Sequence, residues 1–151
     1  MKKENNTLFY SCLLKQEHLK QEFQNCVSKE LKYQKIITLG KELSPFSSAR
    51  KVPENIVQGC QSIVYLYSFL KDGKMQFEAF SEALISSGLA ALLIRTYQNE
   101  SPETVLKCPP QFLEELGIPA SLTPGRSNGL SSIYLLMKQD ALKFLINAQN
   151  N

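Results

Sequence analysis

The sequence lacks the features that would place it in a membrane or on a nucleic acid. No apolar run reaches the roughly 18 residues that a membrane-spanning helix requires. The apolar stretch from Leu8 to Leu14 is interrupted by Tyr10, Ser11 and Cys12, which makes it a poor signal-peptide core. The net charge is only +3, and Lys and Arg form no dense block. We therefore expect a cytoplasmic protein that binds neither a membrane nor a nucleic acid.

Histidine and short cysteine motifs are also scarce. His18 is the single histidine, and Cys12, Cys26, Cys60 and Cys108 include no Cys-x-x-Cys pair. We therefore expect no metal site, no bound cofactor and no disulfide framework, with all but Cys60 acting as small buried apolar residues. A cysteine hydrolase would need an oriented base, whereas His18 lies on a polar part of a predicted helix. No Gly-rich phosphate loop or paired acids stand out.

The chain of 151 residues is long enough for one domain with its own core. We predict a flexible lead-in over residues 1–14, the domain over 15–147 and a frayed tail over 148–151. Apolar spacings of three and four predict helices over 15–27, 29–42, 82–97, 101–106, 109–117 and 128–147. Ser81 is expected to cap the helix at 82–97, which is apolar nearly all round and should be central.

Two strands are predicted at residues 63–70 and 75–80, joined by the hairpin signal Asp72-Gly73. A tight turn pairs Leu66 with Ala79 on a face that should pack on helices, and Tyr65 with Phe80 on the opposite face. That aromatic face is either a partly covered second face or a docking surface. The element order predicts an α+β fold, with a small antiparallel sheet covered by helices.

The stretch from Val57 to Leu66 carries the most informative chemistry. It places Cys60 between Gly59 and the polar pair Gln61-Ser62, directly before the first strand. A thiolate is the reactive form of cysteine, and local charge and exposure set its reactivity. Arg50, Lys51 or Arg126 would supply positive charge if the fold brings them near. Thiol chemistry at Cys60 is therefore the chemistry that this sequence favours.

Four segments of the chain carry the pattern of a known family. They are Phe23-x-x-Cys26 continuing through Glu30-Leu31-Lys32-Tyr33 and Ile36-Ile37-x-Leu39-Gly40-x-x-Leu43; Asn55-x-Val57-x-Gly59-Cys60-Gln61-Ser62-x-Val64; Ser81-x-Ala83 with Gly88-Leu89; and Leu122-Thr123-Pro124-x-Arg126-Ser127-Asn128-Gly129-Leu130. Together they cover roughly residues 20–145. In this pattern the chain resembles the SufE family of sulfur-acceptor proteins, which includes CsdE.

The resemblance implies a function and a set of partners. Cys60 would take a sulfane sulfur from the persulfide of a PLP-dependent cysteine desulfurase of the SufS or CsdA type, and would stimulate that enzyme. The sulfur would pass to an iron–sulfur scaffold such as the SufBCD complex. The protein would be a sulfur carrier rather than a free-standing enzyme, with an IscU-like fold; a homodimer is compatible with the sequence.

The resemblance also assigns roles to individual residues. Gly59, Gln61 and Ser62 would form the acceptor loop with Cys60, and Arg126 would support it. The alternative for Arg126 is a structural role as a tether for the loop before the last helix. The candidates for docking the desulfurase are Asn55, Tyr65, Ser81 and Glu82. The family usually has tryptophan at the position of Tyr65 and aspartate at that of Glu82, so these two departures are expected to change partner affinity.

Three other readings remain open at this stage. A binding-only regulator would stimulate the desulfurase without carrying sulfur, and would tolerate loss of the Cys60 thiol. An IscU-like cluster scaffold would need several converging ligands, which few and widely spaced cysteines do not favour. A structural protein with an inert Cys60 is disfavoured by the position of that residue at a loop–strand junction.

Overall fold

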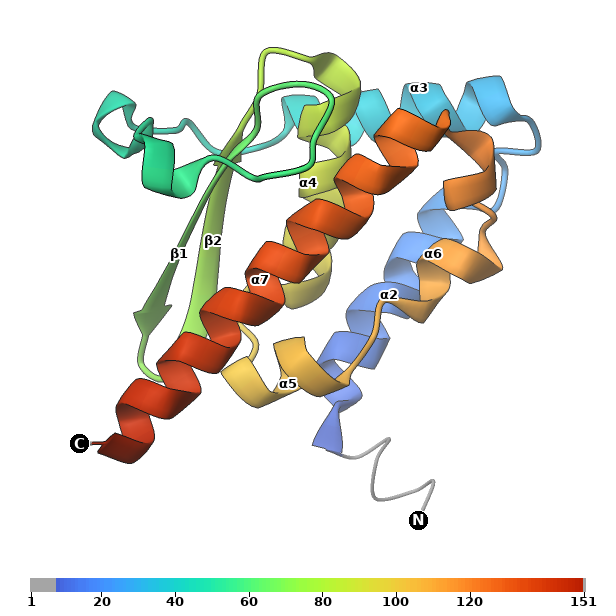
Figure 1. Cartoon of the computed structure of the whole chain (residues 1–151). Helices are drawn as coiled ribbons and strands as arrows, with labels where there is room; N and C mark the ends of the chain where they lie inside the picture. Colours follow the sequence, from blue (N-terminus) through green and yellow to red (C-terminus); the bar gives the residue numbers. More distant parts are fainter. Residues whose placement is uncertain (1–7, 151) are drawn as a thin grey trace.

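The computed structural model describes residues 8–150 as helices packed around one antiparallel hairpin. This arrangement confirms the α+β prediction. In Figure 1 the long helix α7 crosses the front of the molecule, with α4 behind it and the hairpin to one side. The elements are α2 (Tyr10–Phe23), α3 (Lys29–Lys41), β1 (Tyr65–Lys71), β2 (Lys74–Phe80), α4 (Leu84–Tyr97), α5 (Pro102–Lys107), α6 (Gln111–Glu115) and α7 (Pro124–Asn150), with 3-10 turns at Ser48–Arg50, Pro53–Asn55 and Pro119–Ser121.

The hairpin has the predicted register along its whole length. Leu66 pairs with Ala79 and Tyr65 with Phe80. The turn is tight because Asp72 and Gly73 both have positive φ, 54° and 77°, which Asp-Gly accommodates well. The side chains of Leu66, Met75, Phe77 and Ala79 are buried beneath the helices, as predicted for this face. The first strand begins at Tyr65 rather than at Ile63, which is exposed.

Helix α4 is the centre of the core, as its apolar composition predicted. Most of its residues are buried, and it packs on α3, α7 and β2. Gly88 of α4 meets Gly40 of α3: a Cβ added at Gly88 would lie 2.1 Å from the backbone oxygen of Ile36. The close approach of these helices therefore depends on the glycine at this crossing. Ser81 is not the N-cap that we expected, because the helix is capped at Ala83.

The predicted lead-in over residues 1–14 is wrong from Tyr10 onward, where α2 already begins. Cys12 is completely buried in this helix, and Ser11 and Lys15 bond the buried carboxylate of Glu100. Ser11, within the predicted lead-in, is thus an anchor of the helix. At its other end α2 stops at Phe23, which leaves Val27 85% exposed instead of on the predicted stripe. Residues 1–7 lie outside the described part of the chain.

Helix α7 is longer than predicted at both ends. It starts at Pro124, four residues before the expected Asn128, because Pro124 occupies a position where its missing N–H costs no helical bond. Arg126 therefore lies in the first turn of α7 rather than in a preceding link. The helix continues to Asn150, so residues 148–150 are helical instead of a frayed tail. Among residues 8–150, no helix combines the length and apolarity needed to cross a membrane.

The segment between α3 and β1 covers part of the aromatic face of the hairpin. Phe46 packs against Tyr65 and Phe80 with ring centroids 6.1 and 6.3 Å away. The guanidinium of Arg50 lies 3.7 Å above the ring of Tyr67, and the Lys51 ammonium 3.7 Å above that of Phe80. This face is therefore partly covered, and its use as a docking surface stays a prediction.

Candidate functional site

Cys60 lies in a loop whose two ends are bonded together. The amide of Val57 donates to the carbonyl of Val64 over 2.8 Å, which closes the loop at its base. The hydroxyl of Ser81 donates to the carbonyl of Ile63 over 2.8 Å and accepts from the amide of Ala83. Ser81 therefore ties the loop to the start of α4 instead of capping that helix. We call residues 57–64 the acceptor loop.

The thiol of Cys60 points toward α7 and is half-buried. Its Sγ lies 3.7 Å from the carbonyl oxygen of Gly129, to which the S–H donates. The surrounding cavity is small, about 10 Å³, and is lined by Cys60, Gln61, Val64, Ser86, Leu89, Gly125, Arg126, Gly129 and Ile133. The acceptor loop thus holds its sulfur against the first turns of the long helix.

Arg126 joins the acceptor loop to the helical core. Its Nη1 donates to the Oγ of Ser62 over 2.8 Å and to the Oγ of Ser86 over 3.0 Å. Ser62 belongs to the loop and Ser86 to α4, so one guanidinium from α7 connects three parts of the fold. Arg126 thus tethers the acceptor loop, and not the loop before the last helix, which is the tether that we considered from the sequence. A hydrogen bond that involves a charged group is stronger than a neutral one.

Small residues along α7 let the acceptor loop approach closely. A Cβ added at Gly125 would lie 2.5 Å from the Oε1 of Gln61, and one at Gly129 would lie 3.7 Å from the Sγ of Cys60. Gly59 has φ of +89°, which disfavours any residue with a side chain, and a Cβ there would lie 2.7 Å from the Oγ of Ser132. The loop conformation therefore requires glycine at position 59, whereas a methyl group at Gly125 would displace the Gln61 amide and one at Gly129 would make an ordinary contact with the sulfur.

Burial and charge act on the Cys60 thiol in opposite directions. Burial raises its pKa above the ordinary value of 9.0, and the nearby charge of Arg126 lowers it, with burial the larger effect. The thiol is therefore mainly protonated at neutral pH in this conformation. Arg50 and Lys51 do not contribute this charge, since their cations lie on the aromatic rings of the hairpin.

The candidate docking residues lie in part around one surface cavity beside the acceptor loop. This cavity, of about 430 Å³, is lined by Lys51, Ser62, Ile63, Tyr65, Phe80, Ser81, Glu82 and Ala83. Asn55 is not among its lining residues; its side chain donates to the carbonyl of Arg50 over 2.8 Å and braces the preceding segment. Tyr65, Ser81 and Glu82 are thus brought together, and Asn55 is not.

The sequence singled out Gly59, Cys60, Gln61 and Ser62 of this loop but missed several of the loop's contacts. Ser86, Gly125 and Ser132 were not singled out, and Gly129 appeared only within the family pattern. The spacing of Gly125 and Gly129 would have indicated a small-residue face on α7 had the helix been predicted to start at Pro124. No sequence signal marks Ser86, because its role depends on where Arg126 lies in space.

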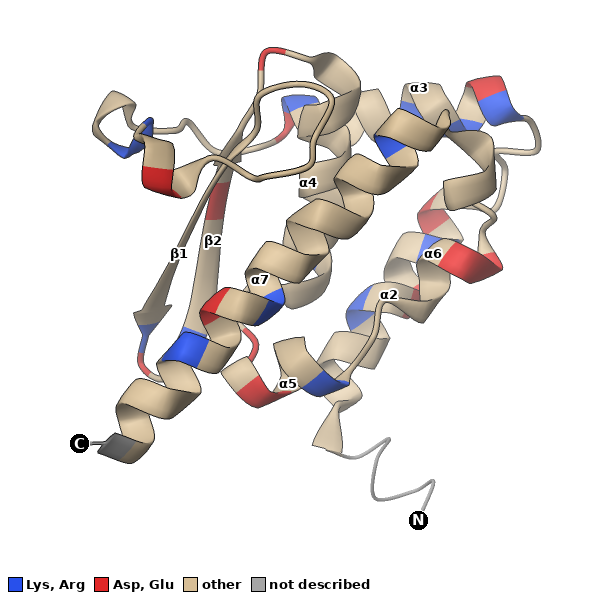
Figure 2. Cartoon of the chain, viewed as in Figure 1, with Lys and Arg blue, Asp and Glu red and all other residues tan. Residues whose placement is uncertain are grey.

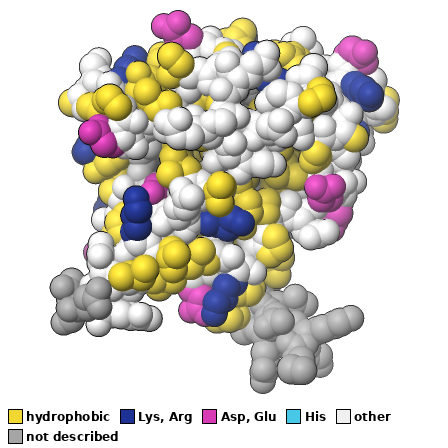
Figure 3. All heavy atoms as spheres, viewed as in Figure 1, with side chains coloured by type: hydrophobic (Ala, Val, Ile, Leu, Met, Phe, Trp, Pro, Cys, Tyr) yellow, Lys and Arg dark blue, Asp and Glu magenta, His cyan; other side chains and the backbone are white. Residues whose placement is uncertain are grey.

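The described surface shows no strong charge of one sign and no metal-binding cluster. Lys and Arg alternate with Asp and Glu over the elements in Figure 2, and residues 55–64 carry no charge. The face shown in Figure 3 carries hydrophobic side chains in separate groups among polar and charged ones. Within residues 8–150, no three His, Cys, Asp or Glu side chains are placed to hold a metal ion.

Comparison with known proteins yields a family match over most of the chain. Residues 17–141 match the SufE family, described as an Fe-S metabolism associated domain. A SufE-like protein of Synechocystis is 36% identical over 122 residues, covering 81% of this chain and 77% of that protein. SufE-like protein 1 of Arabidopsis thaliana, named as chloroplastic/mitochondrial, is 33% identical over 130 residues. Those residues are 85% of this chain but only 35% of the Arabidopsis protein, so the chain spans about a third of that relative.

A solved structure supports the same grouping. The solution structure of a hypothetical protein from Thermus thermophilus has a TM-score of 0.72 and 26% identity, covering 87% of this chain and 96% of that one. These matches do not test the cytoplasmic location expected from the sequence, which stays a prediction. The family match over residues 17–141 and the two relatives above 30% identity show that the chain belongs to the SufE family, with a role in sulfur transfer for iron–sulfur metabolism.

Proposed function

We propose that Cys60 accepts a sulfane sulfur from the persulfide of a PLP-dependent cysteine desulfurase of the SufS or CsdA type. The protein would stimulate that enzyme and deliver the sulfur for iron–sulfur cluster assembly, with a SufBCD-type scaffold as the recipient. The observation that carries the proposal is the position of Cys60 at a closed loop, half-buried against α7 and beside one guanidinium. Such a thiol is protected at rest and becomes available when the loop moves.

The proposed step is an exchange at sulfur without net oxidation. The Cys60 thiolate attacks the outer sulfur of the donor Cys–S–SH, the donor S–S bond breaks, and the donor thiolate leaves. Cys60 then carries the S–SH group. The acceptor side of this reaction needs a thiolate and an open approach to its sulfur. Neither requires a base or a metal from this chain.

The resting geometry blocks that reaction and so implies movement of the acceptor loop. The Sγ of Cys60 faces the Gly129 carbonyl, and burial raises its pKa. A donor cysteine within an enzyme cannot reach a sulfur that faces the acceptor's own helix. The bonds at Val57–Val64 and Ile63–Ser81 leave the loop hinged at its base, while the Ser62–Arg126 bond is the contact to release.

The small cavity beside the thiol supports a protective role after transfer. Its volume of about 10 Å³ is close to the minimum that a cavity needs in order to hold one water molecule. One additional atom bonded to the Cys60 sulfur fits that scale. Persulfides are lost to oxidants and thiol reductants, so enclosure of the outer sulfur would lengthen its lifetime.

A binding-only regulator remains the second candidate, and one observation favours it. The cavity of about 430 Å³ beside the acceptor loop provides a docking surface that does not use the thiol. Contact there would allow the protein to stimulate a desulfurase even when Cys60 stays buried. The two functions differ in whether Cys60 gains mass.

The test is intact-protein mass after incubation with a SufS-type or CsdA-type desulfurase, PLP and cysteine without reductant, followed by peptide mapping. We expect one added sulfur on Cys60, reversed by dithiothreitol. The Cys60→Ser variant should gain none, whereas Cys26→Ser, which removes another partly exposed thiol, should behave as wild type. Stimulation of the desulfurase by Cys60→Ser at the wild-type level would instead establish the binding-only regulator.

A further inference from the structure

Two cysteines outside the acceptor loop form a buried thiol pair. Cys12 lies in the first turn of α2 with no exposed surface, and Cys108 ends α5 with 3% exposed. Gln16, one turn after Cys12, is also buried, and its Nε2 lies 3.7 Å from each of the two sulfur atoms. One amide nitrogen therefore lies between two thiols that come from distant parts of the sequence.

The side chain of Gln16 fixes this arrangement. Its Nε2 also donates to the carbonyl of Pro109 over 3.1 Å, and its Oε1 accepts from the amide of Phe112 over 3.3 Å. The backbone that follows Cys108 is thus held to α2. At Cys108 itself, the hydroxyl of Tyr97 donates to the backbone carbonyl over 2.6 Å. The Cys108 sulfur is held facing α2 by bonds on both sides.

Each thiol acts on the acidity of the other. The neighbouring Cys12 thiol lowers the pKa of Cys108, whereas the Cys108 thiol and burial raise the pKa of Cys12. Cys108 ends α5 and keeps 3% of its surface exposed while Cys12 keeps none, so we assign Cys108 as the thiol that meets an oxidant first. An adjacent second thiol is what a cysteine needs in order to resolve an oxidised intermediate.

We propose that Cys12 and Cys108 form a reversible intramolecular disulfide when hydrogen peroxide reaches the pair. The Cys108 thiolate attacks one peroxide oxygen, the O–O bond breaks, and one water leaves after protonation, giving a sulfenic acid. The Cys12 sulfur then attacks the Cys108 sulfur and expels hydroxide, which takes the Cys12 proton and leaves as the second water. Two thiols lose two electrons, and the hydrogen peroxide accepts them.

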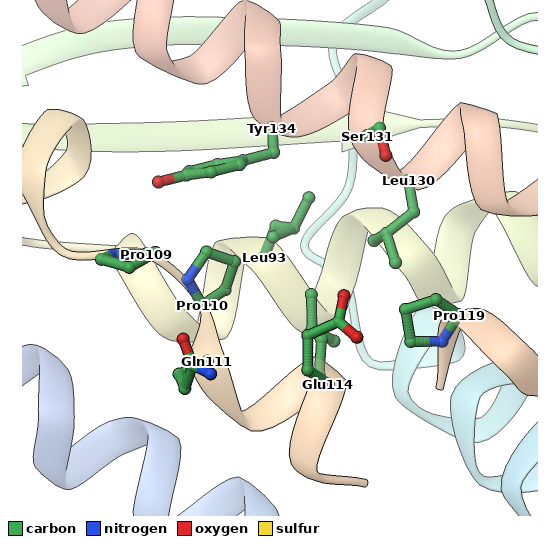
Figure 4. Close-up of a pocket in the computed structure, with 10 residues that line it drawn as sticks. Leu93, Pro109, Pro110, Gln111, Glu114, Pro119, Leu130, Ser131 and Tyr134 are labelled. Carbon is green, nitrogen blue, oxygen red and sulfur yellow. The ribbon is translucent and has the colours of Figure 1, made fainter. Parts of the chain in front are cut away.

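A surface cavity begins one residue beyond Cys108, and neither thiol of the pair lines it. This cavity, of about 250 Å³, is bounded by Pro109, Pro110 and Gln111 on one side and by Tyr134 of α7 on the other (Figure 4). Pro109 follows Cys108 directly. Cys60 lines a different cavity, so the dithiol chemistry is separate from the acceptor loop. Protein disulfides that form in reducing compartments are usually transient and redox-sensing, which suits a buried pair of this kind.

The test uses the full chain with Cys26→Ser and Cys60→Ser, which leaves only the proposed pair. The protein is treated with hydrogen peroxide, quenched, and alkylated in denaturant before intact mass measurement and non-reducing peptide mapping. We expect the loss of two hydrogen atoms, no alkylation, one peptide pair that joins Cys12 to Cys108, and full reversal by dithiothreitol. The oxidised form should melt at least about 5 °C higher, because the bond closes a long loop.

Two outcomes overturn the proposal. One is that both thiols remain alkylated after peroxide treatment, and the other is that they appear as sulfinic or sulfonic acids or as intermolecular disulfides. A third variant, with Cys12→Ser added, tests the order of the steps where it folds. Cys108 should then be trapped by dimedone as a sulfenic acid, and no disulfide should form. The measurement on the Cys26→Ser, Cys60→Ser protein decides the proposal even if the variant with Cys12→Ser added does not fold.

Discussion

The Nη1 atom of Arg126 donates a hydrogen bond of 2.8 Å to the Oγ of Ser62, two residues beyond the acceptor thiol. The same atom bonds Ser86 of α4 over 3.0 Å. The helix that faces the Cys60 sulfur therefore also holds the loop that carries it. The guanidinium is thus both a tether for the loop and the charge that lowers the Cys60 pKa. Substitutions that remove one of these two roles and keep the other can separate them.

The Arg126→Ala variant should change Cys60 reactivity in two distinguishable ways. Loss of the charge should move the midpoint of the alkylation rate against pH upward, because burial then acts on the Cys60 pKa unopposed. Loss of the tether should raise the limiting rate at high pH, since the loop leaves α7 more often. The rate of iodoacetamide alkylation from neutral to alkaline pH measures both.

Matched variants identify the source of each effect. Arg126→Lys keeps the charge, so its midpoint should stay near that of wild type. Ser62→Ala removes only the loop end of the tether and should raise the limiting rate with little change in midpoint, at a stability cost of about 1.5 kcal/mol. An Arg126→Ala profile that coincides with wild type would show that the guanidinium neither holds the loop nor acts on the thiol.

Protonation of Cys60 should make stability depend on alkaline pH. The folded-state pKa is raised above the ordinary value of 9.0, so above that pH the unfolded chain releases the thiol proton while the folded chain keeps it. The stabilisation is complete below pH 9 and is lost as the pH rises through the folded-state pKa. Wild type should therefore lose stability faster than Cys60→Ser as the pH rises above about 9.

Urea unfolding of both proteins across that range provides the measurement. The comparison with Cys60→Ser is needed because the pKa values of Cys12 and Tyr97 are also raised, and those groups titrate in both proteins. Parallel loss of stability in wild type and Cys60→Ser would mean that the folded state does not hold this thiol protonated.

The hairpin and α4 were the parts of the fold most accessible from sequence. Asp72-Gly73 permits a two-residue turn, and such a turn fixes every pair in the register, so Tyr65 had to oppose Phe80. Helix α4 is apolar on all sides, which is consistent only with a central position. In both cases the information is local, and tertiary contacts do not compete with it.

The parts that sequence did not predict depend on contacts between distant residues. The first turn of α2 was missed because Ser11 interrupts the apolar pattern, and its partner Glu100 is far away in the chain. Likewise, the position of Arg50 over Tyr67 depends on how the preceding segment folds back over the hairpin. The acceptor loop was found through the family pattern, whereas its bond to Gly129 and the bond from Arg126 to Ser86 depend on how distant elements pack.

The crossing of α3 and α4 at Gly40 and Gly88 should be the most sensitive position in the core. In Gly88→Ala the new methyl would lie 2.1 Å from the Ile36 carbonyl oxygen, a backbone atom that cannot turn aside. Separation of the two helices should lower the free energy of unfolding by at least about 3 kcal/mol. Urea denaturation of Gly88→Ala and wild type measures this difference.

Gly125→Ala is the matched helical control for Gly88→Ala. Its methyl would meet the Oε1 of Gln61 at 2.5 Å, which is the end of an exposed and flexible side chain. Alanine is the better helix former, so we expect a stability change within about 1 kcal/mol. The effect should appear as faster alkylation of Cys60, because the loop is displaced. Equal stability of Gly88→Ala and wild type would contradict the close helix crossing.

Tyr65 offers the sharpest test of where a desulfurase docks. Its ring lines the cavity beside the acceptor loop, together with Ser81 and Glu82. If the partner buries this surface, Tyr65→Ala should raise about tenfold the protein concentration that gives half-maximal stimulation of the desulfurase, since aromatic side chains commonly dominate interface energy. The maximal rate should stay the same, because the thiol and its loop are intact.

A titration of a SufS-type desulfurase with wild type, Tyr65→Ala and Tyr10→Ala makes the comparison. Tyr10 is a tyrosine on α2 with 65% of its surface exposed, and it does not line the cavity. Its removal should leave the half-maximal concentration unchanged. If Tyr65→Ala also leaves it unchanged, the desulfurase does not use this surface, and the hydrogen bond between Ser81 and the acceptor loop is then purely structural. If only the maximal rate falls, Tyr65 acts on the position of the loop through its packing with Phe46 instead.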